Sequence, residues 1–278
     1  MAVLRVNGLT KYFGINSIFE NVSFELKSGE HIGLVGANGA GKTTLLKCIM
    51  GREEADRGTI KTSDGAVIGY LRQDFDYAGE TIRDEMEEAW EDVLFYKDRM
   101  ERLAAELEFH KDDADLVLEY GKTEARFEFL GGYDYESATK KILTGLGFTE
   151  EDWDRDIHSF SGGQKVRINL AAAFVRHPDF LLLDEPTNHL DMGMLEWLED
   201  YLRSYKGGVL MISHDRYFLD AAATGIIDLE NHRIHSYRGG YTRYMDTKTR
   251  ETAAYEKAYE KQQEHLSLIH ISEPTRLQ

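Results

Sequence analysis

The sequence contains very little cysteine and lacks any long apolar segment. Cys48 is the single cysteine among 278 residues, which excludes an intramolecular disulfide and any zinc site built from cysteines. No apolar run approaches the ~20 residues that cross a bilayer. The N-terminus, residues 1–5, does not show the charged and then apolar pattern of a signal peptide. We therefore expect a soluble, cytoplasmic protein with no membrane part, kept in a reducing compartment.

Basic side chains are also in short supply. The chain has 33 lysines and arginines against 50 aspartates and glutamates, a formal charge of −17. So acidic a protein is not expected to hold nucleic acid through bulk electrostatics. Hydrophobic residues make up 42% of the chain, and a chain of this length buries roughly 75% of its unfolded surface. Composition therefore indicates a packed globular protein with one large domain or two modest ones, and it excludes global disorder.

The acidic charge is concentrated in one segment. Residues 80–136 carry 19 acidic and seven basic side chains. Apolar residues recur there at three- and four-residue spacing among the charges, which is typical of amphipathic helices. The segment is either a solvated helical face, the ordinary explanation, or a projecting element that meets a partner. We predict helices over about residues 80–140, broken at Gly131 and Gly132.

An α/β pattern surrounds this helical insertion. Residues 3–35 alternate in the manner of β-strands, with a break expected at Asn7 and Gly8. Another short strand is expected at 67–71. The continuous apolar runs at 180–183 and 209–212 are typical of parallel strands that are buried on both faces. The sequence therefore predicts an α/β domain.

A glycine-rich loop is the clearest motif of the chain. Residues 36–43 read glycine, four residues, glycine, lysine and threonine, between an apolar strand at 32–35 and a helix expected at 43–50. The glycines let consecutive backbone N–H groups turn inward around an anion, and the helix N-terminus adds partial positive charge. We expect Lys42 to reach the β- and γ-phosphates of a nucleotide and the Thr43 hydroxyl to bind Mg²⁺. The expected phosphate-binding residues are Gly36, Asn38, Gly39, Gly41, Lys42, Thr43 and Thr44.

Two carboxylates and a histidine follow the predicted parallel strands. Asp184 and Glu185 end the strand at 180–183, and ligands of open α/β sheets lie at the carboxyl ends of strands. We expect Asp184 to hold Mg²⁺ through water and Glu185 to orient or deprotonate the attacking water. Taken alone, such a pair is as often ordinary surface charge. His214 comes after the next strand at the same edge, so we expect it to contact the γ-phosphate, although most lone histidines are structural.

A second helix start has the same anion-binding chemistry. Ser161, Gly162, Gly163 and Gln164 precede a helix-like run at 166–175. One nucleotide has one set of phosphates, whereas this chain offers two starts that could bind them. The simplest explanation is that the second helix start contacts the phosphates of a nucleotide bound to another domain of this kind, here called a cassette.

In their order along the chain, these motifs resemble those of an ATP-binding cassette (ABC) ATPase, over residues 3 to about 240. The resemblance implies an ABC-type domain with a mainly parallel sheet and an N-terminal antiparallel β subdomain. It implies ATP and Mg²⁺ as cofactors, with hydrolysis to ADP and phosphate. By the same resemblance, Tyr12 would stack on adenine, with a packed strand tyrosine as the ordinary alternative. Gln73 would sense Mg²⁺ and the water, and Asp191 would couple two sites across a cassette dimer.

The branch of the family is indicated by longer stretches. Residues 184–191, Asp-Glu-Pro-Thr-Asn-His-Leu-Asp, and Gly239-Gly240-Tyr241 before a charged helix are similar to the ABC-F subfamily. Its members carry two cassettes on one chain and act on the ribosome. The resemblance implies a cassette at 1–240, a helical arm at about 80–140 and the start of the inter-cassette linker at 241–265. It also implies the ribosome and tRNA as partners, in translation or in antibiotic resistance.

The end of the chain departs from this pattern. The second cassette is missing, and residues 266–278 resemble a translated sequencing adapter, so we expect them to be an artefact of assembly. The helix over 241–265 is expected to have no partner within this chain. Each site would then need a second cassette, either the missing C-terminal half or another copy.

The sequence is also compatible with two other functions. The alternative is the ATP-binding subunit of an ABC membrane transporter, which would need neither the helical insertion nor the charged helix at the end. A catalytically dead binding module is a third possibility, and the intact Lys42, Asp184, Glu185 and His214 argue against it.

Overall fold

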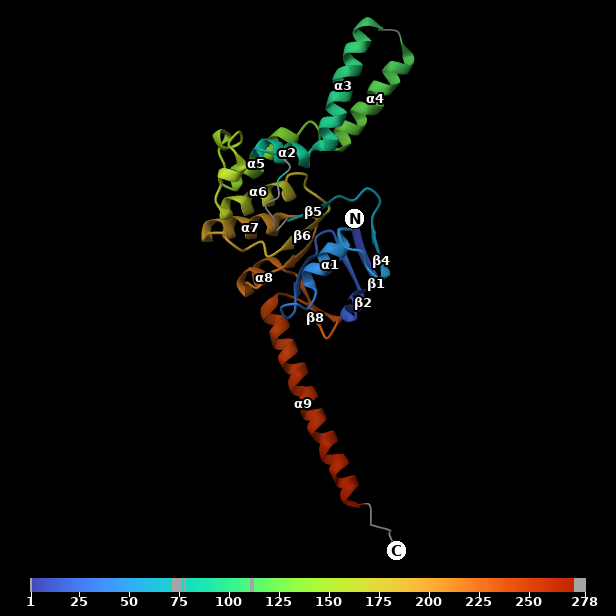
Figure 1. Ribbon diagram of the computed structural model, residues 1–278, viewed down its shortest axis with the longest axis vertical. Helices are drawn as coiled ribbons and strands as arrows, with labels where there is room; N and C mark the ends of the chain where they lie inside the picture. Colours follow the sequence, from blue (N-terminus) through green and yellow to red (C-terminus); the bar gives the residue numbers. More distant parts are fainter. Residues whose placement is uncertain (1, 72–76, 78, 111–112, 273–278) are drawn as a thin grey trace.

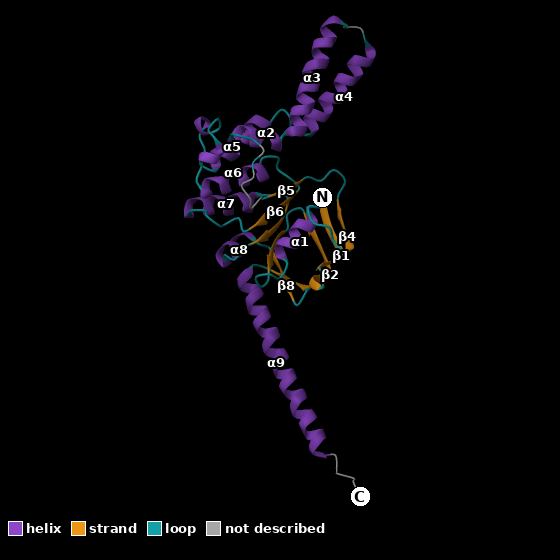
Figure 2. Ribbon diagram, in the orientation of Figure 1, coloured by secondary structure: helices purple, strands orange, loops and turns teal. Residues whose placement is uncertain are grey.

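The computed structural model describes residues 2–71, 77, 79–110 and 113–272, the stretch 262–272 as helical backbone. A body of sheets and helices lies at the centre of the molecule (Figure 1). A helical hairpin projects from one end of this body and a single long helix from the other. Figure 2 shows that the strands are confined to the body. Among the described residues, no helix combines the length and the apolar character that crossing a bilayer requires.

A small antiparallel sheet is formed by β1 (Val3–Phe13), β2 (Asn16–Lys27) and β4 (Arg57–Thr62), in the order β2-β1-β4. The predicted break at Asn7 and Gly8 is wrong, because β1 continues through both residues. Gly8 has a left-handed φ of 57°, and the pairing of β1 with both neighbours shifts in register there. Such a bulge absorbs an irregular residue without ending the strand.

The larger sheet has the order β5-β6-β7-β3-β8-β9, and its first five strands run parallel. The edge strand β9 pairs antiparallel with β8. All residues of β6 and β7 are buried, as their continuous apolar sequences predict. The strands are β3 (His31–Val35), β5 (Ile68–Tyr70), β6 (Phe180–Asp184), β7 (Gly208–Ile212), β8 (Gly225–Glu230) and β9 (Arg233–Arg238).

Helices cover this sheet and form the projections. Those of the body are α1 (Lys42–Ile49), α2 (Ile82–Ala89), α5 (Tyr135–Gly145), α6 (Gly162–Phe174), α7 (Met192–Ser204) and α8 (Arg216–Ala222). Those that project are α3 (Glu91–Phe109), α4 (Ala114–Phe129) and α9 (Tyr241–Ser272). Two short 3-10 turns lie at Glu150–Asp152 and Ile157–Ser159. Helices thus occupy the acidic segment, and α4 ends just before Gly131 and Gly132.

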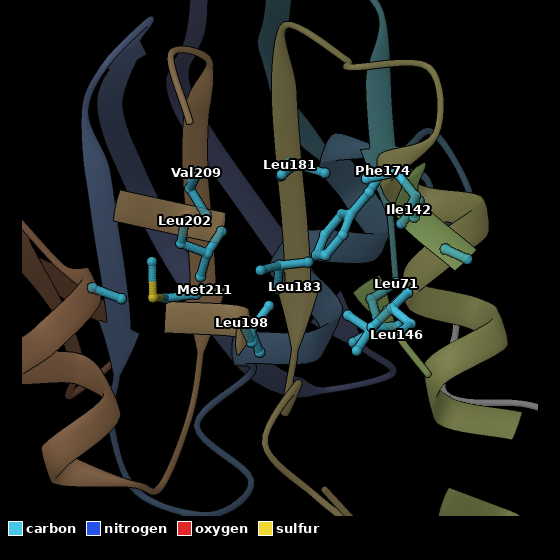
Figure 3. Close-up of a cluster of buried hydrophobic side chains, with 14 of the residues drawn as sticks. Leu71, Ile142, Leu146, Phe174, Leu181, Leu183, Leu198, Leu202, Val209 and Met211 are labelled. Carbon is cyan, nitrogen blue, oxygen red and sulfur yellow. The ribbon is translucent and has the colours of Figure 1, made fainter. Parts of the chain in front are cut away.

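Both faces of the larger sheet are packed, because successive side chains of a strand point to opposite faces. Leu181 of β6 and Met211 of β7 belong to the cluster with α5, α6 and α7, whereas Leu182 and Leu210 belong to the cluster shared with the small sheet and α1. Figure 3 shows the first cluster, with Phe174 of α6 facing β6. This double burial holds the carboxyl ends of β3, β6 and β7 rigidly side by side.

The expectation that the last helix has no partner in the chain is wrong for its first two turns. Tyr244 is only 5% exposed, and its ring packs edge-on against Tyr237 of β9 and Tyr241. The spacing of the two helical tyrosines places both rings toward the body. Farther along, Tyr255 is 73% exposed. The helical backbone runs on to Ser272, so the expected linker and the first part of the segment attributed to an adapter form one continuous helix.

Candidate functional site

The glycine-rich loop connects the end of β3 to the start of α1. A Cβ atom added to Gly36 would lie 2.5 Å from the Leu229 carbonyl oxygen, and one added to Gly41 would lie 2.4 Å from the Ile18 side chain. Both glycines also have positive φ, 149° and 101°. A side chain at either position would therefore push the loop away from its neighbours. The close approach to β2 and β8 fixes the curve in which the loop amides can face an anion.

A cleft of about 760 Å³ opens beside this loop, within the size range of small-molecule sites. The predicted residues Gly36, Asn38, Gly39, Lys42 and His214 all line it. The far wall, which the sequence did not predict, is formed by β8, the turn after it and α9. It includes Asp228, Asn231, His232, Tyr241, Tyr244, Met245 and Lys248.

Lys42 concentrates positive charge inside the loop. Its side-chain nitrogen donates to the carbonyl oxygens of Gly36 and Ala37, at 2.8 and 3.0 Å, and the residue is 8% exposed. The first turn of α1 continues with Thr43, Thr44 and a leucine, without a carboxylate. The helix start, the inward amides and the ammonium therefore all favour a negative ligand.

Asp184 and Thr43 bring oxygen ligands to the same edge. Asp184 ends β6 and is 2% exposed, and it forms a hydrogen bond with the Thr43 side chain. Burial raises the pKa of Asp184, while the Thr43 bond and the charge of Lys42 act against the rise. Among the described residues, no group of three or more histidine, cysteine, aspartate or glutamate side chains is arranged so that it could hold a metal ion by itself. One carboxylate and one hydroxyl, completed by phosphates and water, are the usual protein ligands of Mg²⁺, so these residues fit that ion.

Glu185 and His214 form a pair beside this carboxylate. Glu185 has a left-handed φ of 52°, uncommon for a residue with a side chain. Its carboxylate accepts a hydrogen bond of 3.2 Å from the His214 amide, and the His214 Nε2 atom lies 3.4 Å from its other oxygen. Burial raises the pKa of Glu185, the charge of His214 opposes this, and Asp184 adds to the rise. A strained carboxylate that is only 15% exposed and is paired with a histidine of the cleft lining is a candidate general base.

The second predicted helix start is separate from this cleft. None of Ser161, Gly162, Gly163 and Gln164, all of them described, lines the cleft. The Ser161 side chain accepts from the Gln164 amide at 3.4 Å, and the Gln164 side chain accepts from the Ser161 amide at 2.9 Å. The α6 start is thus capped by its own residues.

Of the other predicted residues that the structure describes, seven do not line the cleft: Gly41, Thr43, Thr44, Asp184, Glu185, Asp191 and Tyr12. Asp191 caps α7 by accepting from the Met194 amide at 3.0 Å. Tyr12 of β1 is 36% exposed, and its hydroxyl lies 3.4 Å from the Glu20 carboxylate. Gln73 lies outside the described residues. The expected roles of Asp191, Tyr12 and Gln73 remain predictions.

The wall formed by α9 could have been found in the sequence. Tyr241, Tyr244 and Lys248 follow one another at three- and four-residue spacing and so share one face of a helix. Burial of Asp228, in contrast, depends on which helix covers β8, and local sequence does not carry that information.

The sequence matches known proteins over most of its length. The profile of the ABC transporter family matches residues 19–188, more than half of the chain, and a second profile, also described as ABC transporter, matches residues 227–269. The chain is 37% identical to the "Putative ATP-binding protein YdiF" of Bacillus subtilis, over 97% of this chain and 42% of that protein. It is 35% identical to "ABC transporter F family member 5" of Arabidopsis thaliana, over 95% and 39% of the two chains.

Other relatives agree with this assignment. The "Energy-dependent translational throttle protein EttA" of Mycobacterium tuberculosis is 32% identical, over 92% of this chain and 46% of that protein. The chain spans less than half of the length of these curated relatives. Among solved structures, "Structure of ATP binding subunit of ABC transporter" has a TM-score of 0.65 at 23% identity, covering 85% of this chain and 90% of that one. This likeness concerns the fold alone, and it confirms the predicted α/β class. The chain therefore belongs to the ABC transporter family, as an ATP-binding cassette of its F branch.

Proposed function

We propose that this chain binds ATP with Mg²⁺ and hydrolyses it to ADP and phosphate, as one cassette of a pair that acts on the ribosome. One observation carries the catalytic part. A cationic loop and helix start, the contact between Asp184 and Thr43, and the pair of Glu185 with His214 meet at one edge of a rigid sheet. These are the parts that phosphoryl transfer requires, because it depends on positioning and on neutralising charge.

The loop would hold the phosphates. The amides of residues 36–43 and the Lys42 ammonium would neutralise the β- and γ-phosphates, which requires Lys42 to leave the two loop carbonyls that it now contacts. Thr43 and Asp184 would hold Mg²⁺, which when bound offsets charge on the transferred phosphoryl group. The remaining loop residues Gly36, Asn38, Gly39, Gly41 and Thr44 would shape this cradle.

Glu185 would act on the attacking water. Its carboxylate would accept a proton from the water as the oxygen approaches phosphorus, and the burial that raises its pKa makes it a better base. The His214 amide holds one carboxylate oxygen, and the His214 Nε2 atom lies 3.4 Å from the other. The imidazole, whose side chain is 63% exposed, would turn from Glu185 to meet the γ-phosphate. Gln73 would help to hold the water and Mg²⁺, and Tyr12 would stack on adenine.

A second cassette would complete the site. The start of α6 does not line this chain's own cleft, so Ser161, Gly162, Gly163 and Gln164 would face the nucleotide of the partner cassette, with Asp191 coupling the two sites. The partner is either a C-terminal cassette or a second copy of this chain. The length of the curated relatives, more than twice the matched part, supports a two-cassette arrangement.

The ribosome is the proposed target of the paired cassettes. Two relatives named as F family members are 35% identical to this chain, and the name of a further relative, at 32% identity, describes a translational throttle. The α3–α4 hairpin would be the arm and α9 the start of the linker, since both project from the body (Figure 1). The protein would then be cytoplasmic and act in translation, as a translation factor or in protection of ribosomes against antibiotics.

Hydrolysis measured against protein concentration tests the catalytic proposal. We expect poor turnover at low concentration and a rising specific activity as chains associate. A high, concentration-independent activity from a proven monomer would contradict the need for a second cassette. Co-sedimentation with ribosomes in the presence of non-hydrolysed ATP, compared with recovery in membranes, separates a ribosomal partner from a transporter.

A further inference from the structure

The long helix α9 touches the nucleotide cleft with its first turns. Tyr241, Tyr244, Met245 and Lys248 line the same cleft as the glycine-rich loop and His214. The remainder of α9 extends away from the body (Figure 1). We call residues 241–248 the α9 root. The α9 root is therefore part of the cleft lining, and it also attaches the long projecting part of the helix to the body.

A buried carboxylate holds this root in place. Asp228 of β8 is only 2% exposed. Its carboxylate accepts a hydrogen bond of 2.8 Å from the Tyr244 hydroxyl and forms an ion pair of 2.6 Å with the Lys248 ammonium. Lys248 also lies 3.0 Å from Glu230. A buried carboxylate is stable only while it is paired, so these two α9 side chains are held firmly against β8.

The anchor lies next to the phosphate loop. Asp228 is paired in register with Val35, the last residue of β3 before the loop, and the Leu229 carbonyl limits the space at Gly36. A movement of β8 or of the α9 root would therefore displace Gly36, the first residue of the loop.

A second attachment reaches the strand end that carries His214. The Thr242 amide donates at 2.7 Å to the Asp220 carboxylate of α8, and the Arg216 guanidinium lies 5.8 Å from the centre of the Tyr241 ring. Helix α8 begins two residues after His214. The α9 root is thus fastened to β8 and to α8, each of which contributes residues to the cleft lining.

We propose that the α9 root is the outer wall of the nucleotide cleft, and that Lys248 and Tyr244 are positioning residues that hold this wall to Asp228. The inference rests on the proposed nucleotide site and adds a mechanical consequence to it. Nucleotide in the cleft would tighten the α9 root, and a firmly attached root would in turn strengthen nucleotide binding. Linkage requires the two effects to be equal.

The test compares variants of the whole chain by nucleotide titration and hydrogen exchange. Fluorescent ATP with Mg²⁺ measures affinity, and mass spectrometry measures exchange of the amides of residues 241–250 with and without non-hydrolysable ATP. In the wild-type chain we expect nucleotide to slow this exchange. Lys248→Met should weaken nucleotide binding by about fivefold or more, at the lower end of typical couplings between sites, and should abolish the protection. Lys257→Met, an exposed lysine of the same helix, is the matched control and should change neither.

A further variant separates positioning from loss of stability. Lys248→Met leaves Asp228 buried without its cation, whereas Asp228→Asn combined with Lys248→Met removes that charge as well. Our proposal predicts that the double variant regains thermal stability but still binds nucleotide weakly. Lys248→Arg, which keeps the cation, should retain most of the affinity.

The outcomes are distinguishable. Unchanged affinity and unchanged protection in Lys248→Met, or full recovery of affinity in the double variant, would overturn the positioning role while the proposed nucleotide site stands. A folded wild-type chain that binds no nucleotide would overturn both.

Discussion

Two helices of this protein begin with small residues and could each receive an anion, but they are built differently. Helix α1 begins after Gly41, which has no side chain to cap it, and Lys42 fills the loop in front of it. Helix α6 begins after Ser161, whose side chain and that of Gln164 satisfy backbone groups of the first turn. The first start needs a ligand for its free amides, whereas the second has part of its capping built in.

The surroundings of the α1 and α6 helix starts differ as well. Helix α1 lies next to Asp184 and opens into the cleft, and Glu185 and His214 stand at the same sheet edge. Helix α6 packs at Gly163 so closely on the His189 carbonyl that an added Cβ would lie 2.8 Å from that oxygen. We infer that the first start binds the chain's own nucleotide, and that the second is a preformed surface for another cassette.

The largest effect is expected at Glu185. Glu185→Gln keeps the size and the acceptor oxygen of the side chain but removes the base, so hydrolysis should fall by about 10²- to 10⁴-fold. Nucleotide binding at the α1 start should remain, and a complete pair of cassettes should retain its ATP. Phosphate release under single-turnover conditions measures this, with the exposed Glu196→Gln as control. Rapid hydrolysis by Glu185→Gln would remove Glu185 from the proposed role.

The next effect is expected at Lys42. Lys42→Ala leaves the phosphate charge uncompensated, and the loss of two charge-assisted hydrogen bonds should weaken ATP binding by about 100-fold or more. Isothermal titration measures this, and Lys47→Ala on the exposed side of the same helix is the control. If Lys42→Ala binds ATP as tightly as the wild type, the α1 start is not the phosphate site.

A smaller and conditional effect is expected at Ser161. Ser161→Ala removes the cap of α6, worth about 1 kcal/mol of stability, but should leave ATP binding to an isolated chain unchanged. Only the extra hydrolysis that appears at high protein concentration should decrease. Ser204→Ala, which removes a comparable surface hydroxyl from α7, is the control. Loss of ATP binding in dilute Ser161→Ala would erase the distinction between the two helix starts.

The smallest effect concerns pH. Burial raises the pKa of Glu185 above its ordinary 4.5, so the carboxylate is protonated at a higher pH than an exposed glutamate. The base form is present above the raised pKa and is lost as the pH falls through it. Hydrolysis by associated chains should therefore decline on acidification at a higher pH than the titration of an exposed glutamate would give, while ATP affinity, measured at each pH, changes less. An activity that stays constant down to pH 4.5 would contradict this role.

The sequence predicts the α1 start and its partners almost completely. A strand, a glycine loop and a helix are adjacent in the chain, and parallel strands necessarily bring Asp184 and His214 to the same edge. The buried anchor of the far wall could not be predicted, for a physical reason. Asp228 and Lys248 are 20 residues apart, and their contact depends on how α9 lies on β8. In the same way, the bulge at Gly8 depends on pairing with two neighbouring strands.

The stoichiometry of ATP binding by the isolated chain tests the central claim most directly. Equilibrium dialysis with radiolabelled ATP in millimolar Mg²⁺, at a protein concentration where the chain is monomeric, measures how many nucleotides each chain binds. It therefore shows whether one or both of the α1 and α6 helix starts bind ATP. We expect one nucleotide per chain, abolished by Lys42→Ala and unaffected by Ser161→Ala. No bound nucleotide on a folded chain, or a single nucleotide that survives Lys42→Ala and is lost in Ser161→Ala, would contradict it.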